Sequence, residues 1–348
     1  MVTIRSWKKE LLGFVCCLLA LVIFCAGASA VVLPKRYDYG STWDMYLKEE
    51  EDTIDVMFFG SSLAYCDVVP ATIYQETGIT SYVMAGPEQT MPITYRYLRQ
   101  ACKTQSPKAV FIEVSGMLYA KHNRSTKINI CYMPWSVDRL AATFQEATPE
   151  EQMGLIFPLY SYHSRWEEIE GEEVIQGLFG YGPDDLAGYT FLEQVYPVTE
   201  LAQREMEDHP EVYQENLGYV EKILELCEKE GIHPIFFVVA NANRPTDEDM
   251  ARIQADITAL GGEFWDCNQD FSELGIDLEI DFYDALHFNY RGAEKFSRYL
   301  GEHLLSQGLT PTEGEDESLW QQRVEHFNTL RDEADEKPIQ LSGAALQQ

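Results

Sequence analysis

The sequence predicts an α/β fold, a three-layer sandwich in which helices cover both faces of a central parallel sheet. Short apolar runs that end in Gly, Ser or Pro recur along the chain, and segments with helical spacing of apolar residues separate them. Such alternation favours parallel strands, because a parallel connection needs a long crossover that a helix supplies.

The predicted strands are short and almost wholly apolar, as expected for strands buried on both faces. They cover residues 54–59, 81–85, 109–114, 234–240 and 263–266. The predicted helices cover residues 70–76, 95–104, 211–230, 247–260 and 291–305. This order is typical of the flavodoxin-like sandwich, in which ligands bind at the carboxyl ends of the strands.

We expect the sheet domain to span residues 50–308. Residues 116–210 interrupt the strand and helix rhythm and are rich in Tyr, Pro and Glu, so we interpret them as a cap inserted over the active-site edge. Residues 309–348 begin with the acidic segment 313–317 and continue with helical spacing over 319–334, which predicts an appended helix with a loose tail.

The N-terminal segment, residues 1–36, is predicted to be a signal anchor. Residues 11–33 carry no charge, and about 20 apolar residues suffice to cross a bilayer. Basic residues precede the run, which places the rest of the chain outside the cytoplasm. The small residues 26–30 leave a cleaved signal peptide, and hence a secreted chain, as the alternative. A third alternative, lipidation of Cys25, fits poorly with the bulky Phe24 before it.

Charge and cysteine content narrow the function classes. The chain has 57 acidic and 26 basic residues and a formal net charge of −31, which disfavours nucleic acid as a partner. No calcium-loop or other metal-ligand spacing occurs, so we expect neither a metal site nor a cofactor. Beyond the apolar segment, we interpret the cysteines as small buried residues, with one or two disulfides as the alternative. These cysteines are Cys66, Cys102, Cys131, Cys227 and Cys267.

Two short motifs predict a nucleophilic site. The sequence Gly60-Ser61-Ser62-Leu63 follows the first predicted strand, and Asp284-Ala285-Leu286-His287 lies near the end of the sheet domain. A serine hydroxyl needs a base within hydrogen-bond reach and a group that orients this base. Ser62, His287 and Asp284 supply these three roles.

Backbone N–H groups near Ser62 are the expected oxyanion donors. Ser62 begins a helix after a buried strand, and Gly86 follows the second strand without a Cβ that would hinder a substrate. Each motif alone has a simpler explanation, since Gly-Ser-Ser turns are common and Asp284 can be a helix N-cap beside a surface histidine. Their joint occurrence at both ends of an α/β domain favours the catalytic interpretation.

With Ala85-Gly86-Pro87, these motifs resemble the blocks of the SGNH, or GDSL, hydrolases, over residues 54–305 without the insertion. The resemblance implies Ser62 as nucleophile, His287 as base, Asp284 as its orienter, and Ser62 and Gly86 in the oxyanion hole. The block that holds an Asn in that family departs from the pattern here. Ser115 and Asn241 are the candidates for the third oxyanion donor.

The apolar anchor and the insertion also resemble extracytoplasmic members of this family that take part in teichoic-acid D-alanylation and polysaccharide O-acetylation. The resemblance implies a serine esterase or O-acyltransferase. Its substrates would be acyl esters, mainly acetyl esters, of a carbohydrate or cell-envelope polymer. A membrane-bound O-acyltransferase is the implied partner. The alternative is a catalytically weak or inactive envelope protein that binds glycans or partners such an acyltransferase.

One cluster in the insertion is a candidate substrate site. His163 and Arg165 lie among aromatic residues between Tyr160 and Trp166. Arg165 can hold a carboxylate or phosphate or stack on a sugar, and His163 can transfer protons. The alternative is an aromatic packing cluster in which Arg165 pairs with one of the neighbouring glutamates.

Overall fold

The computed structural model describes residues 4–35, 43–206, 209–312 and 317–343. The chain divides into two compact units. The first, here called the helix unit, combines residues 1–36 with residues 148–181. The second, the sheet unit, combines residues 37–147 with residues 182–348. Each unit is described by itself.

The sheet unit contains a five-stranded parallel sheet of order β2-β1-β3-β5-β7. This confirms the predicted α/β class with a central parallel sheet. Strands begin and end within two residues of the predicted positions, because each is an apolar run buried between two helical layers. The strands are β1 (Val56–Gly60), β2 (Ser81–Ala85), β3 (Ala109–Glu113), β5 (His233–Val238) and β7 (Glu263–Asp266).

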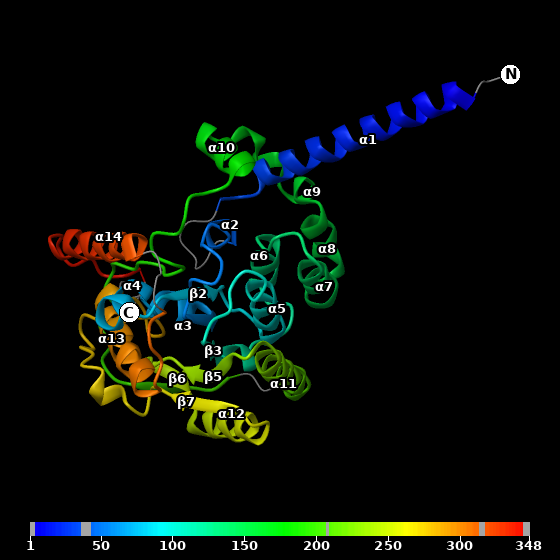
Figure 1. Ribbon diagram of the computed structural model, residues 1–348. Coiled ribbons are helices and arrows are strands. Elements are labelled where there is room, and N and C mark those ends of the chain that lie inside the picture. The colour runs from blue at the N-terminus through cyan, green and yellow to red at the C-terminus, as the bar shows by residue number, and fades with distance from the viewer. Residues whose placement is uncertain (1–3, 36–42, 207–208, 313–316, 344–348) are drawn as a thin grey trace. The chain divides into compact units, whose positions relative to one another are not determined.

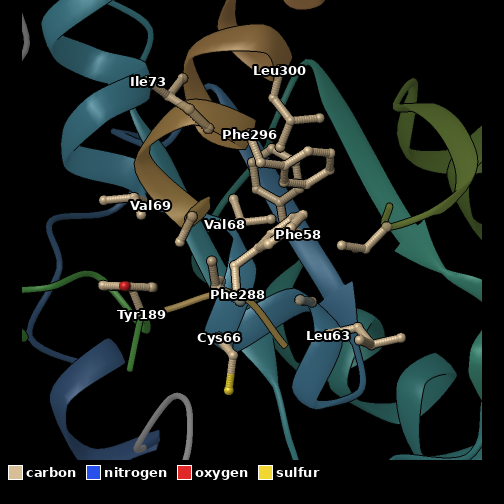
Figure 2. Close-up of a cluster of buried hydrophobic side chains, with 14 of the residues drawn as sticks. Phe58, Leu63, Cys66, Val68, Val69, Ile73, Tyr189, Phe288, Phe296 and Leu300 are labelled. Atoms are coloured by element: carbon tan, nitrogen blue, oxygen red, sulfur yellow. The ribbon is translucent and has the colours of Figure 1, made fainter. Parts of the chain in front are cut away.

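Helices cover both faces of the sheet (Figure 1). Phe58 on β1 faces α4 and α13, where it joins a buried cluster with Ile73 and Phe296 (Figure 2). The opposite face packs against α5, α11 and α12. The helices of these layers are α4 (Pro70–Thr77), α5 (Met91–Ala101), α11 (Pro210–Glu230), α12 (Asp247–Ala259) and α13 (Tyr290–Ser306).

The predicted insertion, residues 116–210, contains several short helices and contributes to both units. Its middle part, residues 148–181, belongs to the helix unit together with the N-terminal helix α1 (Ile4–Val32). Residues 7–32 of α1 are long and apolar enough to cross a membrane, a test that a signal sequence also passes. The other elements of this unit are α8 (Pro149–Ile156), α9 (Pro158–Tyr162), η2 (His163–Glu167) and α10 (Gly171–Phe179).

The remaining parts of the insertion lie in the sheet unit. One of their helices, α7 (Val137–Glu146), buries mainly polar residues and exposes apolar ones. It buries Asp138, which forms ion pairs with Arg99 and Lys103, while Phe144 is 58% exposed. Asp138 is thus buried at the edge of the packed face, while its partners Arg99 and Lys103 remain partly exposed. The other short elements are α2 (Trp43–Tyr46), α3 (Ser62–Asp67), η1 (Val114–Met117), α6 (Thr126–Cys131), β4 (Ala202–Arg204), β6 (Asn243–Pro245) and η3 (Phe271–Glu273).

The appended helix α14 (Glu317–Asp335) is docked on the sheet unit. Trp320 stacks on Tyr74, and Arg323 forms an ion pair with Glu49 in which both side chains are almost wholly buried. Removing one partner of such a pair costs about 3 to 5 kcal/mol, so the helix is an integral part of the unit. The acidic segment predicted ahead of it lies outside the described residues except for Glu317.

All eight cysteines are free thiols. The prediction that the later ones are buried is confirmed for four of the five, and Cys102 is partly exposed. Burial raises the pKa of the Cys102 and Cys227 thiols to about 12, which makes both poorly reactive.

Candidate active site

The structure brings together the three side chains that the sequence predicts as a nucleophilic site. Nε2 of His287 lies 2.8 Å from Oγ of Ser62, and Nδ1 of His287 lies 3.0 Å from both carboxylate oxygens of Asp284. The serine begins α3 directly after β1, while the other two residues lie in the loop before α13. This arrangement places a base between a hydroxyl and a carboxylate, as nucleophilic catalysis by serine requires.

The loop that carries Asp284 and His287 is folded by the carboxylate itself. Oδ1 of Asp284 accepts the backbone N–H groups of Leu286 and His287 at 2.7 and 2.9 Å. The backbone N–H of Tyr283 donates to the carbonyl of His287 across the turn. One side chain therefore shapes the turn and orients the imidazole, which explains why Asp and His stand three residues apart.

Phe288 anchors this loop in the core. Its ring packs against Phe296 of α13 at a centroid distance of 5.9 Å (Figure 2). Its backbone N–H donates to Oδ1 of Asp67 at 2.8 Å. Asn289 then caps α13 by accepting the N–H groups of Arg291 and Gly292. The imidazole is thus held by a rigid segment rather than by a free loop.

Gly292 allows the loop and α13 to approach closely. A Cβ at this position would lie 2.4 Å from the carbonyl oxygen of Asp281. Four residues between Asp284 and Gly292 therefore have a structural role: Asp284 shapes the turn, Phe288 anchors the loop, Asn289 caps α13 and Gly292 permits the close approach.

The turn that presents Ser62 depends on a buried glutamate, Glu113. Its Oε2 accepts the backbone N–H of Ser61 at 3.2 Å and the hydroxyl of Ser61 at 2.6 Å, and its Oε1 accepts the N–H of Ser115 at 2.7 Å. Gly60 has φ +139° and passes so close that a Cβ there would lie 2.5 Å from Cβ of Glu113. Ser61 also caps α3 by accepting the N–H of Leu63.

Asp284 is held in its ionised form. Burial acts to raise the pKa of this carboxyl, but the hydrogen bond and the charge of His287 and the two backbone N–H groups act more strongly, so the net pKa is lowered. The side chain of His287 is 16% exposed and that of Asp284 31% exposed. The pair is therefore partly exposed at the surface of the sheet unit.

The predicted oxyanion donors are only partly available. The backbone N–H of Ser62, in the first turn of α3, has no acceptor among the described residues. The N–H of Gly86 donates to the carbonyl of Gly60 at 3.1 Å. Ser115 donates its N–H to Glu113, and Nδ2 of Asn241 donates to the carbonyl of Val239. Of these donor atoms, the backbone nitrogen of Ser62 is the one without a hydrogen bond in the part of the chain that the structure describes.

No protein-family model matches the chain, and a search of curated proteins gives no significant relative. The functional interpretation therefore depends on the motifs and on the geometry of the site.

A groove of about 190 Å³ has Ala285, which lies between Asp284 and His287, in its lining. Ala202 of β4 and Asn243 of β6 also line it. Tyr196 adds an aromatic wall. A substrate in this groove would meet the loop that carries the imidazole.

The predicted substrate residues His163 and Arg165 lie in the helix unit, whereas the serine, histidine and aspartate lie in the sheet unit. The guanidinium of Arg165 donates to the carbonyl of Val32 and pairs with Glu173, each at 2.8 Å. Nδ1 of His163 lies 3.1 Å from the carbonyl of Tyr160. These contacts match the alternative in which Arg165 is tied to a nearby glutamate.

Three residues near the site were missed by sequence reasoning. Glu113 and Asp67 are fully buried carboxyls that hold the serine turn and the histidine loop, and Arg204 has a buried Nε without an acceptor among the described residues. Single charged residues at strand and helix ends give no sequence signal. No group of potential metal ligands occurs in the described part of the chain.

Proposed function

We propose that this chain is a serine esterase or O-acyltransferase of the SGNH type. The single observation that supports this most strongly is the hydrogen-bonded series from Ser62 through His287 to Asp284. The three groups come from opposite ends of the sequence, and the separate contacts of Glu113 and Phe288 hold each end in place.

In the proposed mechanism, Oγ of Ser62 attacks the carbonyl carbon of an acyl ester while Nε2 of His287 accepts the hydroxyl proton. The tetrahedral intermediate then collapses, the bond to the alcohol oxygen breaks, and the imidazolium returns the proton to that oxygen. The acyl group stays on Ser62 as an ester. Water or a sugar hydroxyl, deprotonated by His287, then attacks this ester. The bond between the acyl carbon and Oγ of Ser62 breaks, and the imidazolium returns the proton to Oγ, which restores the free serine.

The free N–H of Ser62 stabilises the developing oxyanion, at the positive end of α3. Gly86 supplies a second donor when a substrate displaces the Gly60 carbonyl from its N–H. This reorganisation has a cost, so we expect a lower rate than in a site whose donors are all free beforehand.

The proposed substrate is an acyl ester, acetyl above all, of an extracytoplasmic carbohydrate or cell-envelope polymer, and α1 holds the enzyme at the outer face of the membrane. The net charge of −31 favours a neutral glycan over an anionic polymer. The positive charge of Arg204 locally offsets this negative charge beside the groove. It lies on the same face of its strand as Ala202, which lines the groove.

A second candidate function is a catalytically weak or inactive envelope protein that binds glycans or partners a membrane-bound O-acyltransferase. The engagement of Gly86, Ser115 and Asn241 in other hydrogen bonds favours it. The intact contact between Ser62 and His287 favours the enzyme.

Labelling of the purified full chain with a fluorophosphonate distinguishes these two functions. We expect labelling of the wild type, complete loss in Ser62→Ala, and a severe reduction in His287→Ala. Ser306→Ala, at an exposed serine on α13, is the matched control and should label fully. A folded wild-type chain that never labels would overturn the enzymatic proposal.

A further inference from the structure

Helix α10 in the helix unit has an exposed apolar face. Ile175, Leu178 and Phe179 are 61%, 53% and 76% exposed, and their spacing places them on one side of the helix. On another side, Nε2 of Gln176 donates to Oε1 of Glu172. The polar and apolar residues of α10 are thus segregated, as in helices that lie along a membrane surface.

The same helix packs against the end of α1, the membrane-length helix (Figure 1). Gly177 makes this contact possible, because a Cβ there would lie 2.9 Å from Cα of Val31 and 3.0 Å from the carbonyl oxygen of Ala30. Leu178 contacts α1 about one turn closer to the N-terminus of that helix, where a Cβ on Gly27 would lie 3.6 Å from its Cδ2. The small residues of α1 thus form a docking surface for α10.

Polar contacts fix the same end of α1. The guanidinium of Arg165 joins the carbonyl of Val32 to the carboxylate of Glu173 on α10. The backbone N–H of Leu159, on α9, donates to Oγ of Ser29. Residues 148–181 therefore surround the last turns of α1 as part of one compact unit.

The position of this contact along α1 sets its depth in a bilayer. The uncharged part of α1, from Leu11 to Val32, has 22 residues, and at about 1.5 Å per residue it is about 33 Å long. The hydrocarbon core is about 30 Å thick, which corresponds to about 20 residues. With Leu11 at one hydrocarbon boundary, the other boundary falls near Ala30 and Val31, the residues that Gly177 contacts. The exposed face of α10 lies at the level where headgroups meet acyl chains.

We propose that residues 148–181 form a membrane-interface collar around the end of α1, with Ile175, Leu178 and Phe179 inserted into phospholipid. Trp166, 68% exposed, is of the type that accumulates at this level of a membrane. The collar also contains glutamates 167, 168, 170 and 172, so insertion depends on apolar contact and not on attraction to anionic lipid.

The collar has a consequence for the N-terminal segment. Residues 26–30, which suggested a signal-peptidase site in the sequence, are the residues on which α9 and α10 dock. Cleavage after Ala30 would remove the helix that the collar packs against, so the collar requires an uncleaved anchor. This inference is independent of the proposed esterase activity, because the collar and the triad belong to different units.

Lipid-depth quenching in nanodiscs tests the collar. Phe179→Cys and, separately, Glu172→Cys are introduced into the full chain with Cys16→Ala, Cys17→Ala and Cys25→Ala, and each is labelled with an environment-sensitive dye. Quenchers are an acyl-chain spin label in phosphatidylcholine and iodide in the water. We expect the dye at residue 179 to lose several-fold more emission to the spin label than the dye at residue 172, and iodide to give the reverse order.

Ile175→Cys places the dye at a second position on the apolar face. It shows whether a result at residue 179 arises from misfolding of the Phe179 variant alone. Iodide access without spin-label quenching at both 175 and 179 would overturn the collar, since the face would then be free for a protein partner. Equal spin-label quenching at 172 and 179 would also overturn it, because the helix would be immersed rather than interfacial. Stronger quenching at 179 in anionic phosphatidylglycerol discs would contradict insertion by apolar contact.

Discussion

Nε2 of His287 lies 2.8 Å from Oγ of Ser62, although 225 residues separate the two along the chain. The serine is placed by β1 and the histidine by the loop before α13, and the two segments meet at Asp67, which accepts the N–H of Phe288. The contact is therefore a property of the packed core and not of either motif.

Asp284→Asn tests the role of the carboxylate. The amide oxygen can still accept the N–H groups of Leu286 and His287, so the loop should keep its shape. The imidazole loses its anionic partner, and we expect the rate of fluorophosphonate labelling to fall by about 10³ to 10⁴. Asp332→Asn on the surface of α14 is the control. Wild-type labelling in Asp284→Asn would show that the carboxylate is not part of the mechanism.

Ser61→Ala tests the support of the nucleophile turn. The variant keeps the Ser62 hydroxyl but removes the N-cap of α3 and the 2.6 Å hydrogen bond to buried Glu113. We expect labelling about 10-fold to 100-fold slower than wild type, since small displacements of a nucleophile have effects of this size. The measurement is the labelling rate, with the far-ultraviolet circular dichroism spectrum as the fold control. A rate equal to that of the wild type would mean that Ser62 is positioned without Ser61.

Gly60→Ala is expected to destabilise the chain by about 3 kcal/mol or more, because the new methyl group meets Cβ of Glu113 at 2.5 Å in a backbone conformation with φ +139°. Gly261→Ala is the matched control, with φ +87° and no atom within 4 Å of the new methyl group. It should cost only about 1 kcal/mol of backbone strain. Chemical denaturation of both variants measures the difference, and equal losses would contradict the close approach to Glu113.

Asp67→Asn should stabilise the chain at neutral pH. Burial raises the pKa of the Asp67 carboxyl well above its usual range, and the charges of Asp284 and Glu113 raise it further. A raised pKa in the folded state means that stability is full below the usual carboxyl pKa and falls as pH rises toward the folded pKa. The asparagine oxygen still accepts the N–H of Phe288.

We expect a gain of about 1 kcal/mol at pH 7 that disappears near pH 4, measured by denaturant midpoints at both pH values. Asp332→Asn again serves as control and should change neither midpoint. A gain that persists unchanged at low pH would indicate a packing effect in place of relief of a buried charge.

The sequence by itself determined the sheet and the positions of the motifs. Apolar runs such as residues 81–85 and 263–266 specify strands without reference to the rest of the chain, and their bounds match the structure. The uncharged run of residues 11–33 likewise predicts a membrane-length helix by composition alone. These are local properties, because hydrophobic periodicity and turn chemistry act over a few residues.

Only the tertiary structure decided how distant segments meet. The buried Glu113 under Ser61, the anchoring of Phe288 by Asp67, and the use of Gly86 N–H by the Gly60 carbonyl are contacts between segments far apart in sequence. The packing of residues 148–181 on α1 is of the same kind. One sequence carries no record of such pairings, since a buried polar group is stabilised by whichever partner the fold brings to it.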